Sequence, residues 1–276
     1  MSDVYVDIHI HANACSDEGF TFEKLSAWMA DNAVERCCVQ QFRQTLPRNA
    51  AERQHLRDQF AAYAGTIDRF DMLFPDEVTS TAEAVDRLSR MKEDGVVGFG
   101  EHYGEGLRID DPKCMRLYAA CAEVGLPVLF HSDSGNNIDA FGLPGLERAL
   151  QAHPDCSFIG HAPGWWRNIS AEPDAGAGAS VIPGGAVDRL LTEYPNMYGD
   201  LSAGSGAKAI GRDRAYGREF LIRHADQLLF GTDSGPWSEG MRPAPQFELL
   251  ASLKLPQDVR SKIYRDNAIQ LLELRA

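Results

Sequence analysis

The stretch Val4-Tyr-Val-Asp-Ile-His-Ile-His11 alternates apolar and polar residues near the start of the chain. Side chains two positions apart in a β-strand point to the same face, so His9 and His11 are expected side by side, with Ile8 and Ile10 on the opposite face. Two imidazoles on a stiff strand suit a metal such as zinc. One such pair is ambiguous, and its meaning depends on the rest of the chain.

Similar apolar runs alternate with amphipathic stretches along the whole sequence. Strands are predicted over 4–10, 35–40, 70–74, 96–100, 127–130, 157–160, 196–201 and 227–231, and helices over 22–32, 50–64, 81–93, 112–124, 186–194 and 215–223. Such alternation favours parallel strands joined by right-handed crossovers. The chain is therefore predicted to be an α/β protein, a (β/α)8 TIM barrel with one domain over residues 1–276. A helix over 257–274 would close the chain against the outside of the barrel, and a doubly wound open sheet is the alternative.

Two local patterns add detail to this fold. Ser80 and Glu83 have the spacing of a capping box at the start of the third helix. The segment 165–185 is rich in Gly, Ala, Pro and Ser, and we expect it to form a lid over the mouth of the barrel.

Composition limits the classes of function. The formal net charge of −13 and the absence of a basic patch argue against nucleic-acid binding as the main task. The six cysteines form no C-x-x-C pair, which is typical of reduced thiols in a cytoplasmic protein. No signal segment or membrane span is visible. We expect a protein of the cytoplasm that acts on a small molecule, and we leave open whether it forms homo-oligomers.

Ligand-type residues stand where five of the predicted strands end. In an α/β barrel the active site lies at the carboxyl ends of the strands. Imidazoles and carboxylates together suit zinc, manganese, iron or cobalt better than calcium. A single such residue is usually a cap or a hydrogen-bonded polar group, and Asp133, Asp200 and Ser202 are interpreted as turn formers or helix caps. The candidate metal ligands are His9, His11, Glu101, His131, His161 and Asp233.

Indications of the substrate are fewer. Arg43 and Arg108 follow the second and fourth strands, where arginine could clamp a carboxylate or phosphate, so an anionic substrate is conceivable. Trp165 and Trp166 could form an aromatic wall of the pocket. His102, next to Glu101, is expected on the opposite face of its strand, and a role beside the ligands or towards substrate is considered for it.

The combined motifs resemble the amidohydrolase superfamily, and within it the amidohydrolase-related metal-dependent TIM-barrel hydrolases and decarboxylases. The resemblance spans the whole chain and ends in a closing helix with Asn267-Ala and Leu271-Leu. It rests on Asp7-Ile-His-Ile-His11, Leu126-Pro-Val-Leu-Phe-His131, Phe158-Ile-Gly-His161, Tyr198-Gly-Asp-Leu-Ser202 and Leu229-Phe-Gly-Thr-Asp233.

The resemblance implies roles for these residues. His9, His11 and Asp233 match ligands of the more buried metal. His131 and His161 match the pair that binds a second metal or, in one-metal members, substrate and water. Glu101 stands where the superfamily often has a carboxylated lysine, and a bridging glutamate there would favour two metals. One or two divalent ions are expected, zinc first, with Mn²⁺, Fe²⁺ or Co²⁺ as alternatives.

The expected activity is hydrolysis of an amide, lactam, lactone or ester bond. A metal would lower the pKa of bound water from 15.7 towards about 7. Asp233 would take up that proton and later deliver it to the leaving group, and His161 or His131 would help to polarise the carbonyl. The alternatives are non-oxidative decarboxylation of a small carboxylic acid, a TatD-type phosphoesterase or nuclease, and a binding protein without activity. The intact ligand set argues against the last of these.

Overall fold

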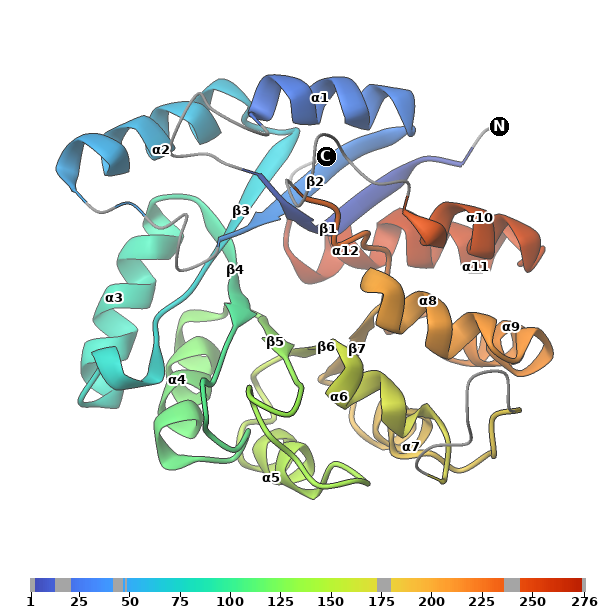
Figure 1. Ribbon diagram of the computed structural model, residues 1–276. Coiled ribbons are helices and arrows are strands. Elements are labelled where there is room, and N and C mark those ends of the chain that lie inside the picture. The colour runs from blue at the N-terminus through green and yellow to red at the C-terminus, as the bar shows by residue number, and fades with distance from the viewer. Residues whose placement is uncertain are drawn as a thin grey trace.

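The computed structural model describes residues 3–12, 21–41, 47, 49–172, 180–235 and 244–274. Eight parallel strands follow one another around a single sheet in chain order (Figure 1). The sheet closes because the backbone N–H of Ile8 donates to the carbonyl of Phe230 (3.1 Å) and that of His11 to Ser234 (2.7 Å). The predicted barrel is confirmed. Its strands are β1 (Tyr5–His11), β2 (Val34–Gln40), β3 (Ile67–Asp71), β4 (Val96–His102), β5 (Val128–His131), β6 (Phe158–His161), β7 (Met197–Asp200) and β8 (Leu228–Leu229).

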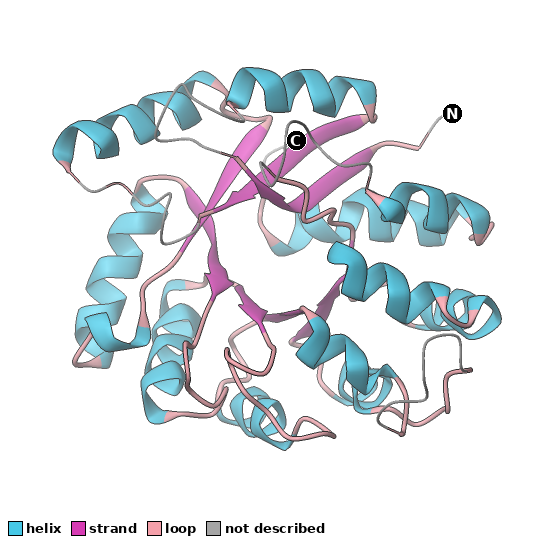
Figure 2. Ribbon diagram, in the orientation of Figure 1, coloured by secondary structure: helices cyan, strands magenta, loops and turns pink. Residues whose placement is uncertain are grey.

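Helices surround the ring of strands (Figure 2). The main ones are α1 (Phe22–Asp31), α2 (Ala50–Ala62), α3 (Thr81–Glu93), α4 (Pro112–Val124), α5 (Pro144–Ala152), α6 (Pro163–Trp166), α7 (Ala186–Glu193), α8 (Ala203–Gly211), α9 (Arg214–Arg223) and α10 (Pro245–Ser252). Short 3-10 turns are η2 (Pro75–Glu77) and η3 (Arg167–Ile169). No helix among these described segments is long and apolar enough to cross a membrane.

The predicted capping box at α3 is formed with a different partner. Ser80 Oγ accepts the backbone N–H of Glu83 (3.2 Å), as expected. The carboxylate of Glu83, however, accepts from the backbone N–H (2.9 Å) and hydroxyl (2.8 Å) of Thr79. The first turn of α3 is thus tied to two preceding residues.

Two parts of the element prediction were wrong. The third strand begins three residues earlier than predicted, because its charged residues are paired and can be buried: Asp68 binds Arg36 and Asp71 binds Arg69. The helices α5, α6, α8 and α10 were not predicted. Three of them begin at a proline, which is suited to the first helical position, and α8 is rich in glycine.

The lid expected over 165–185 begins with structure of its own. Residues up to Trp166 belong to α6, and η3 follows directly. Residues 173–179, which hold most of its Gly and Ala, lie outside the described part of the chain.

The interior of the barrel is filled by side chains from all eight strands. At β4, Gly98 makes room for the ring of Phe70, because a Cβ at position 98 would lie 2.2 Å from that ring. The interior cluster contains Val6, Ile8, Cys38, Phe70, Val97, Leu129, Ile159, Tyr198 and Leu229.

An irregularity in β1 changes which side chains face this interior. Asp7 pairs with Cys37 and Ile10 with Val39, so three steps along β1 match two along β2, as in a β-bulge. Ile8 therefore belongs to the interior cluster, whereas Ile10 packs towards the helices. The expectation that Ile8 and Ile10 share one face was wrong, since the bulge shifts the alternation.

The end of the chain closes the barrel from the side where the strands begin. The predicted helix over 257–274 consists of α11 (Gln257–Ser261), the π-helical turn η4 (Lys262–Asp266) and α12 (Asn267–Leu271). Leu272 and Leu274 then join the interior cluster. This segment therefore closes the amino-terminal opening as well as packing against the outside.

Candidate metal centre

The six predicted ligands lie together at the carboxyl ends of the strands. β1 carries His9 and His11, β4 carries Glu101, β5 and β6 end at His131 and His161, and Asp233 follows β8. His9, His11, Glu101 and His161 are buried, with exposed fractions of 0–2 %. Three groups suited to hold an ion are found among the described residues: His9–His11–Glu101, Glu101–His131–His161 and His9–His161–Asp200.

Glu101 occupies the centre of this cluster. Its Oε2 lies 3.4 Å from His9 Nε2 and 3.7 Å from His11 Nε2. Its Oε1 lies 2.5 Å from His131 Nδ1 and 3.4 Å from His161 Nε2. Each carboxylate oxygen thus faces a different pair of histidines, which is the arrangement that a carboxylate bridging two ions would need.

Asp233 completes the side of the cluster formed by β1. Its Oδ1 lies 3.0 Å from His11 Nε2 and 3.6 Å from His9 Nε2. The residue adopts a left-handed φ of 56°, and its backbone N–H donates to the carbonyl of His9 (2.7 Å). A non-glycine residue in that region is strained, and such strain is common where a side chain is held for function. The Asp233 side chain is 25 % exposed, against 2 % for Glu101, so it is the carboxylate open to the mouth.

Each histidine also has a protein acceptor beside its other ring nitrogen. His9 Nδ1 is 2.7 Å from Asp200 Oδ2, and His11 Nδ1 is 3.3 Å from the carbonyl of Gln40. His161 Nδ1 is 2.9 Å from the same Asp200 oxygen. These acceptors favour a proton on Nδ1, which leaves Nε2 of each ring as the atom that faces the carboxylates of the cluster.

The ring of His131 has the opposite orientation, with Nδ1 instead of Nε2 towards Glu101. Its Nε2 is 3.0 Å from Asp133 Oδ2, and its Nδ1 faces Glu101. Tyr103 stacks on the His131 ring, with centroids 4.8 Å apart, and its hydroxyl donates to Glu101 Oε2 (2.8 Å). The Oδ1 of Asp133 accepts the backbone N–H groups of Gly135 and Asn136 (both 2.7 Å), so the turn role predicted for Asp133 is present beside its bond to His131.

The electrostatics of the cluster favour a cation. Burial raises the pKa of Glu101, but the charge of His9 and the hydrogen bond from His131 outweigh it, and the pKa is held well below its usual range. Burial lowers the pKa of His9, yet the carboxylates of Glu101 and Asp200 raise it well above its ordinary value. Positive charge is therefore stabilised among these carboxylates.

Sequence reasoning missed the contributions of Tyr103 and Asp200 to the centre. Asp200 ends β7, and its place at a strand end was the available signal, although it was interpreted as a turn former or cap. Its Oδ1 does accept the backbone N–H of Ser202 (2.9 Å), so the local role and the contact with two histidines coexist. For Tyr103 the sequence carried no signal, because a tyrosine after a strand is common.

Four predicted substrate residues make their observed contacts outside the cluster. His102 is buried between β4 and α4, against Phe99 and Tyr118. The Arg108 side chain is 54 % exposed and pairs with Asp110 (3.0 Å).

Trp165 and Trp166 are core residues, 0 % and 2 % exposed. Trp165 occupies the space beside Gly160, where a Cβ would lie 2.5 Å from its ring. Trp166 donates from its indole nitrogen to the carbonyl of Asp200 (3.0 Å). A tryptophan pair after a strand anchors the loop here instead of lining a pocket. Arg43 lies outside the described residues.

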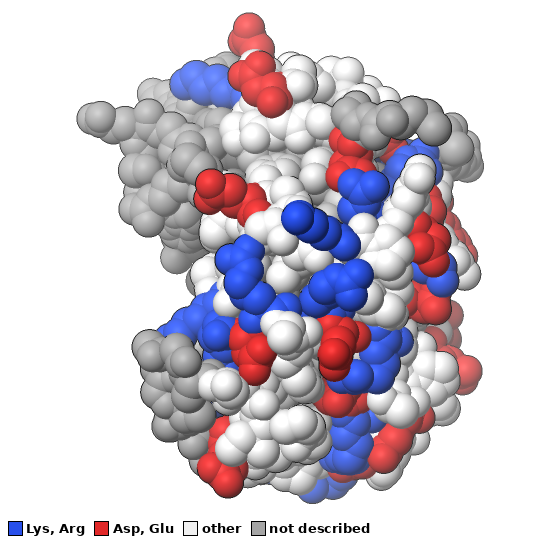
Figure 3. All heavy atoms as spheres, turned by 90° about the vertical axis from the view of Figure 1, so that its right-hand side faces the viewer, with Lys and Arg blue, Asp and Glu red and all other residues white. Residues whose placement is uncertain are grey.

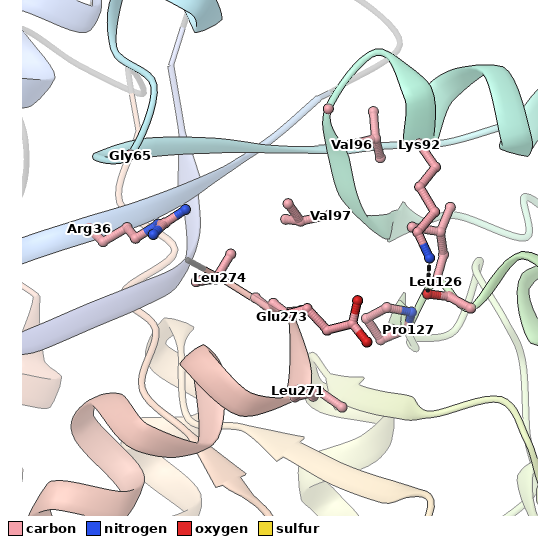
Figure 4. Close-up of a pocket in the computed structure, with 13 residues that line it drawn as sticks. Arg36, Gly65, Lys92, Val96, Val97, Leu126, Pro127, Leu271, Glu273 and Leu274 are labelled. Atoms are coloured by element: carbon pink, nitrogen blue, oxygen red, sulfur yellow. Dashed lines mark hydrogen bonds between the residues drawn. The ribbon is translucent and has the colours of Figure 1, made fainter. Parts of the chain in front are cut away.

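A cavity of about 570 Å³ lies at the other end of the barrel. In Figure 4, Arg36 and Lys92 stand on opposite sides of it, with Glu273 between them. Arg36 is paired with Asp68, and Lys92 Nζ donates to the carbonyls of Val124 (2.8 Å) and Gly125 (3.2 Å). None of the six candidate ligands lines this cavity, so its size does not make it the candidate site.

Charged side chains elsewhere are mixed in sign. On the face shown in Figure 3, basic and acidic side chains are interleaved. Arg223 pairs with Asp188 (3.0 Å) and Lys262 with Asp226 (2.6 Å). The described cysteines, Cys37, Cys38, Cys114, Cys121 and Cys156, are buried and free.

A barrel with histidines and carboxylates gathered at its carboxyl end defines a class of metal-dependent TIM-barrel enzymes. A family model described as Amidohydrolase matches residues 6–274. The chain belongs to this amidohydrolase family, and it is an enzyme. A search of curated protein sequences finds no significant match.

Solved structures share the fold over the full length of the chain. An uncharacterised TIM-barrel protein from Bordetella bronchiseptica is 16 % identical, with a TM-score of 0.69 and 98 % of each chain covered. A putative 2-pyrone-4,6-dicarboxylic acid hydrolase from Pseudomonas putida is 16 % identical, with a TM-score of 0.66 and both chains fully covered. A 5-carboxyvanillate decarboxylase from Novosphingobium aromaticivorans, solved with bound manganese, is 12 % identical, with a TM-score of 0.63 and 99 % and 98 % covered. At these identities the similarity shows a shared fold.

Proposed function

We propose that the protein is a metal-dependent hydrolase that cleaves an amide, lactam, lactone or ester bond of a small molecule. His9, His11, Glu101 and Asp233 would hold one divalent ion. Glu101, His131 and His161 would hold a second. The observation that carries the proposal is the convergence of one donor atom from each residue of the first set.

The spacing of these donors fits an ion. In tetrahedral zinc sites the bonds are about 2.0–2.2 Å long, so neighbouring donor atoms are separated by about 3.4 Å. The separations from His9 Nε2 and His11 Nε2 to the oxygens of Glu101 and Asp233 are 3.0–3.7 Å.

An unpartnered atom points to the same place. His9 Nε2 is buried and has no hydrogen-bond partner, and a buried polar atom in that state is costly unless something binds it. Imidazole and carboxylate donors suit Zn²⁺ or Mn²⁺, and zinc is the first choice. The manganese in the similar decarboxylase structure supports testing both ions.

A bound divalent ion would supply Lewis-acid chemistry, making water more acidic and polarising a carbonyl group. Asp233 would then act as the general base and acid. Burial raises its pKa, but the hydrogen bond from His11 and the charges of His9 and His161 together lower it by more. The net pKa is below the usual value, so the group is a carboxylate at neutral pH. It can take up a proton from water at the open side and return it to the leaving group.

If the protein holds a single ion, His161 and His131 would instead orient the substrate carbonyl on the side of Glu101 away from β1. The similar hydrolase that is named for a 2-pyrone-4,6-dicarboxylic acid makes carboxylated lactones the first substrates to try. We therefore propose an anionic small molecule as substrate. Arg43 stays a candidate residue for binding its anionic group, whereas Arg108 is paired with Asp110 and His102 is buried against Tyr118.

The test combines metal analysis with a substrate screen. Purified protein is expected to contain one or two divalent ions per chain, to lose hydrolysis of a carboxylated lactone or amide on chelation, and to regain it with Zn²⁺ or Mn²⁺. His11→Ala should abolish the activity, while Arg90→Ala, at an exposed position of α3, serves as the control. Full turnover in His11→Ala would contradict the scheme. Release of carbon dioxide from a carboxylic acid, without hydrolysis, would favour the decarboxylase alternative.

A further inference from the structure

We propose that Asp200 is a positioning residue that orients ligands of both metal positions at once. The inference rests on the proposed metal-dependent function. It adds a residue outside the predicted ligand set, and it makes the two halves of the centre depend on one carboxylate.

The distances around Asp200 show that it forms hydrogen bonds to its neighbours and does not belong to an ion site. We call Asp200 with the two rings that it contacts, His9 and His161, the clamp. Asp200 Oδ2 lies 2.7 Å from His9 Nδ1 and 2.9 Å from His161 Nδ1, and it accepts the hydroxyl of Ser202 at 2.6 Å. These are hydrogen-bond lengths, whereas donors around one zinc ion would be about 3.4 Å apart. His9, His161 and Asp200 could be taken for a third ion site, but their spacing assigns them to a clamp.

The clamp fixes which nitrogen of each ring is presented to an ion. A proton on Nδ1 of His9 and of His161 points at Asp200, so Nε2 is the nitrogen of each ring that remains for an ion. His9 Nε2 lies beside Oε2 of Glu101 and His161 Nε2 beside Oε1, at 3.4 Å in each case. One carboxylate on β7 thus sets two rings, from β1 and β6, that serve different ion positions.

Asp200 is itself held tightly. It is 0 % exposed, its Oδ1 accepts the Ser202 backbone N–H (2.9 Å), and its carbonyl accepts the Trp166 indole (3.0 Å). On the remaining side stands Gly231, where a Cβ would lie 2.6 Å from Asp200 Oδ1 and 3.1 Å from the His9 Cβ. Glycine at 231 leaves the space in which the carboxylate can meet both rings.

The experiment compares Asp200→Asn with Asp133→Asn. The asparagine at 200 keeps the shape, but its NH2 group then faces either the Ser202 backbone N–H or the two ring N–H groups, all of which are donors. Loss of such an orienting partner typically weakens metal binding 10- to 100-fold. Competition of the whole protein with a chromogenic chelator for Zn²⁺ should show that loss at every occupied position in Asp200→Asn. Asp133→Asn, whose partner is His131, should leave the affinity of the His9–His11 position unchanged.

A second measurement needs no metal. Nitrogen-15 NMR of the metal-free, histidine-labelled protein should show that Nδ1 of His9 and Nδ1 of His161 each carry a proton hydrogen-bonded to Asp200, and that this hydrogen bond is lost in Asp200→Asn. An Nδ1 atom without a proton in either ring, or an unchanged zinc affinity in a folded Asp200→Asn protein, would overturn the inference. If the unaltered protein binds no zinc, the proposed function fails, while the NMR result still decides the role of Asp200.

Discussion

Asp233 and Glu101 are both carboxylates of the centre, yet their surroundings give them different tasks. Glu101 is enclosed by four histidines and is almost fully buried, which suits a fixed ligand. Asp233 is partly open and contacts the β1 histidines through one oxygen. The two residues are both carboxylates, so it is their difference in exposure that suits Glu101 to holding an ion and Asp233 to moving a proton.

The first prediction follows from that division. Asp233→Asn should lower kcat about 10²- to 10⁴-fold, because an amide cannot carry the proton. Its oxygen can still contact an ion, so zinc content should stay near that of the unaltered enzyme. Steady-state kinetics together with elemental analysis check both parts. A variant that keeps its zinc and its kcat would show that another group moves the proton.

His102 provides a pH-dependent prediction that is independent of the centre's ligand contacts. Burial lowers its pKa to about 3, and neither ring nitrogen has a hydrogen-bond partner. In the unfolded chain the histidine pKa is near 6.5, so between about pH 3 and pH 6.5 His102 is protonated in the unfolded chain but neutral in the folded protein. The contribution of His102 to the free energy of unfolding should therefore be fully present above about pH 6.5 and decrease as the pH falls below that value. At pH 5 the decrease should amount to about 2 kcal/mol.

Urea unfolding at pH 7.5 and pH 5.0 measures this effect. His102→Phe keeps an aromatic ring against Tyr118 and should lose less free energy of unfolding between the two pH values than the unaltered protein. His55→Gln, on α2, is the matched control. Equal pH dependence in His102→Phe and the unaltered protein would show that His102 is solvated or partnered in solution.

At the scale of elements, strands were predicted well because their apolar runs are local. The gathering of the six candidate ligands could be predicted for the same reason, since each stands where such a run ends. The bulge in β1 could not be predicted, because it depends on contacts across the whole chain: the Asp7 carboxylate accepts the backbone N–H groups of His9 and Thr232, both at 3.0 Å. Asp200 was likewise ambiguous until the fold brought two histidines to it.

The approach of β3 to β4 gives a prediction at this scale. Gly98→Ala should lower the free energy of unfolding by about 1–3 kcal/mol, since the added methyl group collides with Phe70 in a filled interior. Phe70→Leu in the same chain should recover part of the loss, because it opens space at that point. Chemical denaturation of the single and double variants measures both. Additive losses in the double variant would mean that the two side chains do not meet.

At the scale of the molecule, the centre connects strands that are far apart in the sequence. An ion bound by residues of β1, β4 and the segment after β8 would link the start, middle and end of the chain. Zinc at 100 times its dissociation constant should raise the free energy of unfolding by about 2.7 kcal/mol, provided that the unfolded chain does not bind it. Thermal unfolding with and without a chelator checks this, and His11→Ala should show no such rise.

The opposite opening gives the last prediction. Leu272 is 3 % exposed within the interior cluster. Leu272→Ala should lower the free energy of unfolding by about 2–5 kcal/mol through the cavity it creates. Under conditions where the variant is folded, kcat should not change, because the centre lies at the other end of the strands. A drop in kcat with an unchanged melting temperature would contradict this separation.

The leucine-closed opening and its cavity of about 570 Å³ have a practical consequence. Residues there are remote from the predicted chemistry, so heat tolerance and catalytic selectivity can be engineered on separate sets of positions. Larger apolar side chains at Val97, which lines this cavity, are a natural starting library for the first goal. Improvements found there should carry over unchanged to variants selected for new substrates.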